Sequence, residues 1–182
     1  MRLKRKQLRM LIESVINEQQ GFKPNYTDKD AGTVSELHHE LNPGEYGLIG
    51  KQKKFIELRN SYRAADSKRS SAVGYVNPRS EVALNPRQLQ AEMEKAEDAY
   101  DAQAKEVIKL YKENSESDLF KDGKGNKIEL DFNKLTAFKY FGAEDGASAF
   151  KKFGDFTTAK THVEQVFKNC EEFENHFDGF IP

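Results

Sequence analysis

The strongest constraint on the fold is a long helix that the sequence predicts after residue 85. Asn85 and Pro86 form a helix start, because asparagine caps free backbone amides and proline suits the first helical position. From there to about Glu113 the apolar side chains recur at spacings of four and three. They are Leu89, Met93, Ala96, Tyr100, Val107 and Leu110, with Gln103 as a polar interruption. Such a helix needs a partner along one whole side, either another helix of the chain or a second copy of the chain.

The second half of the chain supplies most of the other core candidates. Eleven of the thirteen phenylalanines lie from residue 120 onward, and aromatic rings bury large areas. A final helix is predicted to begin at Thr157 or Thr158 and to stop at Gly179. Its buried face is expected to hold Ala159, Val163, Val166, Phe167, Cys170, Phe173 and Phe177. We therefore expect residues 85–182 to form a compact, bundle-like helical core.

Residues 118–132 carry the pattern of a small β-hairpin. Gly123 and Gly125 suit its turn, and the apolar residues after it alternate. The alternating residues are Ile128, Leu130 and Phe132. Alternatively, Asp131 caps a short helix that follows. The expected fold class is mainly α, with a helical C-terminal core, this small β-hairpin and an N-terminal amphipathic helical arm.

Two shorter helices are predicted ahead of the long one. The first begins at Thr33 and ends before Pro43. The second covers about residues 48–65 and is followed by a loop-like segment, residues 66–85, in which serines, Gly74 and Pro78 break any helix. Residues 33–84 would thus form a two-helix segment with its loop, and residues 19–32 would be a linker.

Residues 1–18 combine a cluster of cations with an apolar stripe at helical spacing. The cations are Arg2, Lys4, Arg5, Lys6 and Arg9, and the stripe is Leu8, Leu11, Ile12, Val15 and Ile16. Cations at a helix N-terminus oppose the helix macrodipole, so this helix would fray in isolation. We expect this basic amphipathic arm to become ordered by docking on a partner.

A second run of cations lies in residues 51–69, with seven lysines and arginines against two acidic residues. The secondary basic patch expected there consists of Lys51, Lys53, Lys54, Arg59 and Arg63. Phe55 and Tyr62 are interleaved with these cations, so nucleic acid could use the surface for phosphate contacts and stacking. The two rings are seven residues apart and share the predicted buried face, which favours a solvated basic helix instead.

Charge and composition narrow the classes of function. The net charge of −1 divides into +5 for residues 1–85 and −6 for residues 86–182. A local basic site is therefore expected rather than a protein coated with nucleic acid. The single cysteine, Cys170, permits no intramolecular disulfide and fits a reducing compartment. No apolar run approaches the roughly 20 residues of a membrane span, and no continuous apolar segment marks a secretory signal.

Local patterns that resemble metal sites fail on spacing. His38 and His39 are adjacent, so they point about 100° apart on a helix and cannot share one metal ion. The loop from Asp122 places Lys124 at the third position of a calcium loop, which needs an oxygen ligand, and Lys127 at the sixth, which needs glycine. No metal site and no cofactor are expected.

Patterns that resemble catalytic or phosphate sites fail as well. Glycines at 44, 47 and 50 do not match the phosphate loop of nucleotide-binding proteins, although a looser anion site at the start of the second helix remains an alternative. Ser148 lacks the closing glycine of a nucleophile elbow. Cys170 lies on the apolar face of the last helix, which is typical of a core residue. The motifs therefore nominate no catalytic residue.

The N-terminal sequence MRLKRKQLRMLIESVINE resembles the leader helices of virion proteins of large tailed phages, especially marine relatives of the T4-like group. Some internal and head proteins of that group carry capsid-targeting leaders, which the prohead protease cuts after a hydrophobic-x-Glu pattern. Leu11-Ile12-Glu13 and Ile16-Asn17-Glu18 match that pattern. The resemblance implies leader cleavage after Glu13 or Glu18, and it covers the first 18 of the 182 residues.

Three classes of function follow. The leading hypothesis is a non-enzymatic virion or assembly protein of a tailed phage, docking through its basic arm on a protein or on packaged nucleic acid. The second is a phage or bacterial inhibitor or regulator that binds a host protein through its helical C-terminal part. The third is an enzyme without a local signature, using His38, His39 or His162. We expect a location in the virion or the host cytoplasm, a protein partner, and self-association through helix 86–113 as a further alternative.

Overall fold

The structure is a computed structural model that describes residues 28–71, 85–143 and 156–177. These residues form five α-helices and one 3-10 helix, and no β-strand occurs among them. The elements are α2 (Asp28–Leu41), α3 (Leu48–Ser71), α4 (Pro86–Glu113), η1 (Asp118–Phe120), α5 (Phe132–Lys139) and α7 (Phe156–Phe177). The mainly α fold is thus confirmed, while the predicted arm of residues 1–18 lies outside the described residues.

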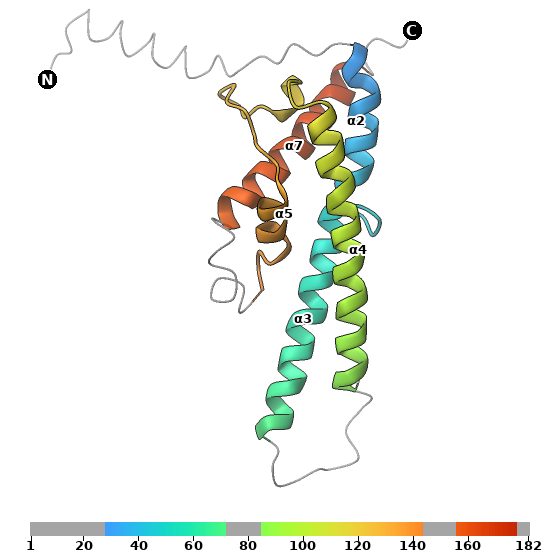
Figure 1. Cartoon of the computed structure of the whole chain (residues 1–182), viewed down its shortest axis with the longest axis vertical. Coiled ribbons are helices and arrows are strands. Elements are labelled where there is room, and N and C mark those ends of the chain that lie inside the picture. Colours follow the sequence, from blue (N-terminus) through green and yellow to red (C-terminus); the bar gives the residue numbers. More distant parts are fainter. Residues whose placement is uncertain (1–27, 72–84, 144–155, 178–182) are drawn as a thin grey trace, which may run out of the picture.

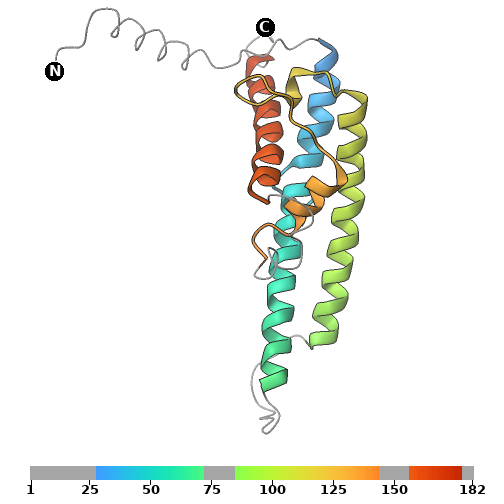
Figure 2. The ribbon, with the colours of Figure 1, turned by 60° about the vertical axis from the view of Figure 1, so that its left-hand side comes forward.

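Helix α4 is the axis of the molecule. Its 28 residues span about 42 Å, and α2 and α3 lie nearly end to end along it (Figures 1 and 2). Helix α7 packs on α2 and on α5. The lower halves of α3 and α4 project beyond α5 and α7 as a helical hairpin (Figure 1). None of the described helices is long and apolar enough to cross a membrane.

The start of α4 agrees with its sequence signals. The side-chain oxygen of Asn85 accepts a hydrogen bond from the Arg87 amide at 3.2 Å, and the Gln88 side chain accepts one from the Asn85 amide at 3.2 Å. This capping box places Pro86 at the first helical position. The helix continues to Glu113, as predicted.

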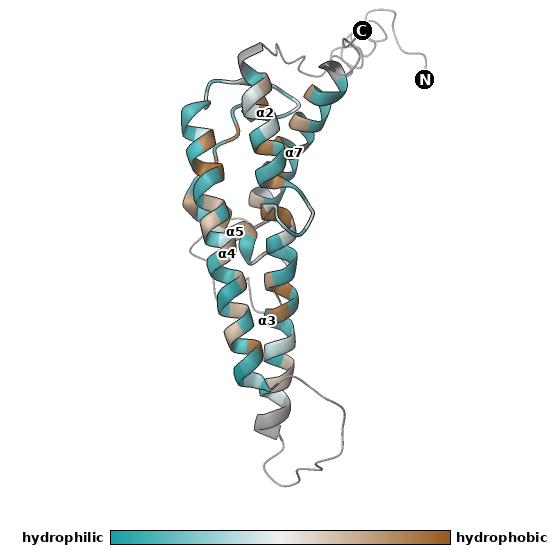
Figure 3. Ribbon diagram, turned by 90° about the vertical axis from the view of Figure 1, so that its right-hand side faces the viewer, coloured by the Kyte–Doolittle hydropathy of each residue, from teal (hydrophilic) through white to brown (hydrophobic). Residues whose placement is uncertain are grey.

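The apolar seam of α4 is occupied inside the chain. Its buried members are Leu89, Tyr100, Ala104, Val107 and Leu110. They face α2, α3 and α5, so the helix has its partners within one molecule. Self-association through α4 would therefore have to use the opposite face, which is exposed and mostly hydrophilic (Figure 3).

The predicted β-hairpin at residues 118–132 is wrong. Its only ladder contact within the described residues is an isolated bridge between Lys121 and Lys127. The Asp122 carboxylate instead accepts the Lys124 and Asn126 amides at 2.8 Å each, which forms a side-chain-closed loop. Alternation ends at Asp131, whose carboxylate accepts the Lys134 amide at 2.7 Å and caps α5. The alternative of a short helix after Asp131 is confirmed for residues 132–139.

Helix α2 begins earlier than expected. It starts at Asp28 rather than Thr33, so residues 28–32 of the predicted linker are helical. The Thr33 hydroxyl does not cap the helix but donates to the Asn114 side chain at 3.1 Å. This bond ties α2 to the C-terminal end of α4.

The turn from α2 into α3 explains the repeated glycines at 44, 47 and 50. A Cβ atom on Gly47 would overlap the backbone of Asn42, and one on Gly50 would overlap the carbonyl group of Gly44. The Gly44 amide also donates to the Asn42 side-chain oxygen at 2.6 Å. The glycines whose spacing resembles a phosphate loop therefore allow two backbone segments of this turn to pack closely together.

One hydrophobic cluster joins the described helices. It draws on α2 and the start of α3 as well as on α4, α5 and α7, so it contains residues from both sides of residue 85. Its fully buried large members include Leu37, Leu41, Leu48, Tyr100, Phe120, Leu135 and Val163. The predicted face of the last helix is confirmed at Ala159, Val163, Val166, Cys170 and Phe173.

Candidate functional site

A partly buried cluster of charged side chains lies between α3, α4 and α5, with Lys139 at its buried centre. The Lys139 ammonium lies 2.9 Å from Glu97 Oε1 and 2.8 Å from Asp101 Oδ1, and its side chain is only 4% exposed. The Tyr140 hydroxyl donates to Glu97 Oε1 at 2.8 Å. We call these residues, together with Arg59, the Lys139 cluster.

Arg59 joins the cluster from α3 through aromatic rings. Its guanidinium carbon lies 5.1 Å from the Tyr140 ring centroid and 6.0 Å from that of Phe55. The two rings meet edge to face with centroids 5.3 Å apart, and Lys139 lies 5.2 Å from the Tyr140 centroid. Two cations and two carboxylates therefore balance in one partly buried, partly aromatic environment.

The surroundings of the cluster shift the pKa values of Glu97 and of two tyrosines. Burial raises the pKa of Glu97, but hydrogen bonds from Lys139 and Tyr140 outweigh it and hold that pKa below its usual value. Burial and the bond to Glu97 raise the pKa of Tyr140. The fully buried Tyr100 hydroxyl donates to the Leu135 carbonyl at 2.7 Å, and burial raises its pKa well above normal. An ionised Glu97 and neutral tyrosines suit a structural support rather than proton transfer.

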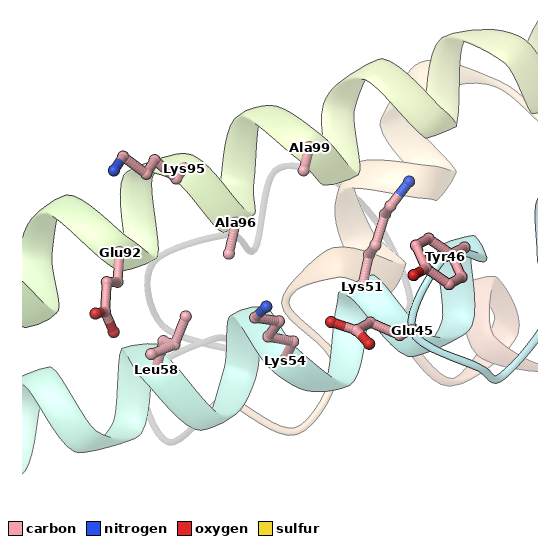
Figure 4. A pocket seen from close by; sticks show the side chains of 9 residues that line it. All are labelled: Glu45, Tyr46, Lys51, Lys54, Leu58, Glu92, Lys95, Ala96 and Ala99. Carbon is pink, nitrogen blue, oxygen red and sulfur yellow. The ribbon is translucent and has the colours of Figure 1, made fainter.

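A groove of about 510 Å³ opens between α3 and α4 (Figure 4). The small side chains of Ala96 and Ala99 on α4 leave space for this groove. Leu58 and Lys54 of α3 border it on the other side. The other lining residues are Glu45, Tyr46, Lys51, Glu92 and Lys95. Three lysines and two glutamates give the groove mixed charge. It can take a small amphipathic group, but no single ligand chemistry is favoured by this lining.

Gln103, the polar residue in the apolar seam of α4, connects three helices at the end of this groove. Its side-chain oxygen accepts a hydrogen bond from the Lys51 ammonium, and its amide nitrogen donates to the Glu40 carboxylate. The same nitrogen lies 3.4 Å from the Glu40 carbonyl oxygen. The polar interruption therefore ties α4 to α2 and α3.

The residues of the predicted secondary basic patch do not form one surface. Lys51 and Lys54 both line the groove, where Lys51 also bonds to Gln103, whereas Arg59 belongs to the Lys139 cluster. Lys53 borders a different hollow of about 280 Å³ near Phe141. Arg63 lies exposed farther along α3.

A basic face on the outer side of α4 was missed by the sequence analysis. Its members are Lys105, Ile108, Lys109, Lys112, Glu113 and Phe132, and they border a hollow of about 540 Å³. We call them the α4 basic face. The spacing of the three lysines was visible in the sequence, but the position of Phe132 beside them depends on α5, which the hairpin pattern concealed.

The three histidines considered for catalysis lie in different environments. His38 Nδ1 lies 3.0 Å from Glu174 Oε1, and its ring stacks on Phe167 with centroids 5.1 Å apart. His39 is exposed. Burial lowers the pKa of His162, and its Nδ1 atom is buried without a hydrogen-bond partner among the described residues.

The described part of the chain contains neither a group of metal-binding side chains nor a reactive thiol. No group of three or more His, Cys, Asp or Glu side chains is placed there to hold a metal ion. Cys170 is completely buried on α7, and burial raises the pKa of its thiol to about 12. The thiol is therefore a core side chain and not a nucleophile at neutral pH, in agreement with the sequence.

These features define a class by architecture: an elongated protein of packed α-helices with a partly buried, charge-balanced cluster. Comparison of the chain with models of known protein families, with curated proteins and with solved structures gave no match. No relative therefore supplies a function, and the residues themselves must indicate one.

Proposed function

We propose that the protein is a non-enzymatic virion or assembly protein of the tailed-phage kind, and that it docks on a partner protein through residues 1–18. The observation that carries this proposal is the sequence of that arm, which joins five cations to an apolar stripe of five residues. The stripe can pack on a partner groove, and the cations add an attraction that salt weakens. Because the arm resembles phage leaders, the proposal also includes removal of the arm by cleavage after Glu13 or Glu18.

Two groups of the described body fit the non-enzymatic part of this proposal. Its most deeply buried ammonium group, that of Lys139, is held by two carboxylates. Its thiol at Cys170 has a raised pKa. Groups that enzymes commonly use as base or nucleophile thus serve packing and charge balance in this body.

Analysis of the native particle tests the proposal. Mass spectrometry of purified phage particles from the source should find the protein, with an N-terminus at Ser14 or Gln19 if the arm is a cleaved leader. An intact Met1 in the particle would support docking without cleavage. Absence of the protein from the particles would contradict the proposal.

Full-length variants test the arm itself. Leu11→Asp with Val15→Asp breaks the apolar stripe and should reduce incorporation into particles about tenfold or more. The matched control is Ala91→Asp with Ala102→Asp, which places two aspartates on the exposed side of α4. Both proteins should keep the helical circular dichroism of the parent. Equal incorporation of the arm variant and the control would contradict docking through the stripe.

A further inference from the structure

The α4 basic face carries cations that the fold itself does not use. Lys105, Lys109 and Lys112 are exposed, and none of them forms an ion pair within the described residues. By contrast, Lys127 and Lys139 have carboxylate partners at 2.9 Å or less. The free cations lie at spacings of four and three, so they share one side of α4 over about 10 Å.

An exposed aromatic ring lies beside these cations. Phe132, at the first position of α5, is 49% exposed, although most large apolar side chains of the described body are buried. Ile108 is half-buried between the lysines and packs against the core cluster. The α4 basic face therefore has an apolar floor and a cationic rim around its hollow of about 540 Å³.

We propose that the α4 basic face binds an acidic amphipathic helix of a partner protein. Carboxylates spaced four and three residues apart on such a helix would match the lysine spacing on α4. An apolar side chain between them would cover Phe132 and Ile108, which supplies the desolvated contact that charge pairs alone lack. This surface lies on the body and is independent of residues 1–18.

Nucleic acid fits this face less well than an acidic helix. Binding to duplex DNA gains most of its affinity from many phosphate contacts, about six to ten in well-studied cases. Three lysines supply fewer, and Glu106 and Glu113 stand beside them on the same helix. A continuous polyanion would meet those carboxylates, whereas a short acidic helix need not.

A second copy of the chain also fits less well. Glu94 and Asp98 lie on the exposed side of α4, toward its N-terminus, and could face the lysines in an antiparallel pair. Their neighbours on that side are Ala91 and Ala102, which offer little apolar area to Phe132. Exposed ion pairs without such a contact contribute little to association.

The test measures binding of a labelled synthetic peptide to the full-length protein by fluorescence anisotropy. The peptide is a helix with glutamates at positions i, i+4 and i+7 and a leucine at i+3, and its scrambled form is the reference. We expect the helical peptide to bind more tightly than the scrambled one. Lys105→Glu with Lys109→Glu should weaken binding about tenfold or more, and Phe132→Ala should do so about fivefold or more.

Two matched variants keep the result specific. Lys95→Glu with Lys54→Glu changes the same charge at the α3–α4 groove and should leave peptide binding unchanged. Arg5→Ser with Lys6→Ser removes cations from the arm and should also leave it unchanged, so the proposal can fail or succeed apart from docking by residues 1–18. Lys109→Gln provides a milder substitution if charge reversal disturbs the fold.

Three results would overturn the proposal. The first is equal binding of helical and scrambled peptides, and the second is loss of binding in the arm variant but not in the Lys105 and Lys109 variant. The third is preferential binding of single-stranded oligonucleotide, or a concentration-dependent dimer in sedimentation that Lys109→Glu abolishes. Either form of the third result would assign the face to nucleic acid or to a second copy.

Discussion

Lys139 shows why a charged residue can lie in the interior of this protein. Taking an ammonium group out of water costs several kcal/mol, and two carboxylates within 2.9 Å offset that cost. The rings of Tyr100 and Tyr140 surround the remaining side of the group at 5.8 and 5.2 Å. The carboxylates are about one-third exposed, so water still solvates the acidic side of the cluster.

Removing the cation should therefore be costly. Lys139→Met keeps most of the side-chain volume but removes the ammonium group that binds both Glu97 and Asp101, so that Arg59 is the cation left in the cluster. We expect a loss of about 3 kcal/mol in the free energy of unfolding, measured by urea titration. Lys168→Met, which breaks the exposed pair with Glu172, should change it by no more than about 0.5 kcal/mol. Equal losses in the two variants would contradict the structural role of Lys139.

The lowered pKa of Glu97 predicts a dependence of stability on pH. The folded-state pKa lies below the ordinary value of 4.5, so the unfolded chain binds the proton more readily. The stabilisation by Glu97 is thus complete above that value and is lost as the pH falls through the folded-state pKa. The difference in unfolding free energy between the parent and Glu97→Gln should shrink between about pH 6 and about pH 3.

An exposed glutamate on the same helix provides the control for this titration. Glu106→Gln removes an exposed carboxylate from the same helix and should change the unfolding free energy by no more than about 0.5 kcal/mol. A Glu97→Gln difference that stays constant with pH would show that the carboxylate is not stabilised in the folded state.

At the scale of elements, the sequence predictions succeeded where residues close together in the chain determine the structure. The start of α4 depends on Asn85, Pro86 and Gln88, which lie next to each other in the chain, so the sequence contains all the information. The buried face of α7 follows from helical periodicity alone. Both predictions are confirmed.

The failures arose where tertiary contacts or side-chain capping competed with a pattern. The alternation of Ile128, Leu130 and Phe132 resembled a strand, but the carboxylates of Asp122 and Asp131 close the loop and cap α5. The Lys139 cluster was not predicted because its members come from three helices. No spacing within one segment could indicate that Lys139 meets Glu97 and Asp101.

The α2–α3 turn makes a prediction about two kinds of glycine. Gly47→Ala places a methyl group on the Asn42 backbone and should destabilise the protein by about 1–3 kcal/mol. Gly32→Ala lies inside α2 with no atom near the new methyl group, so it should stabilise by about 0.5–1 kcal/mol. Thermal and urea unfolding would measure both, and a stabilising Gly47→Ala would refute the proposed close packing of this turn.

At the scale of the whole molecule, charge complementarity explains why α3 is not a free basic surface. Residues 51–69 carry seven cations and two anions, and α3 runs antiparallel to the N-terminal part of α4 (Figure 1). That part of α4 holds Glu92, Glu94, Glu97, Asp98 and Asp101. The basic helix therefore lies along an acidic one, whereas the lysines of the α4 basic face belong to the C-terminal half of α4, beyond those carboxylates.

A single core should make the described helices unfold together. Leu37 of α2 is fully buried in the cluster that also contains Val163 of α7 and Val107 of α4. Leu37→Ala should therefore lower the stability of the whole unit by about 2–5 kcal/mol rather than loosen α2 alone.

Far-ultraviolet circular dichroism reports all helices, and tyrosine fluorescence reports Tyr100 among others. The two signals should give one midpoint in the parent and one lower midpoint in Leu37→Ala. The exposed α2 substitution Ser35→Ala is the control and should leave the midpoint nearly unchanged. Two separate transitions, with only the first moved by Leu37→Ala, would mean that the segments on either side of residue 85 fold independently.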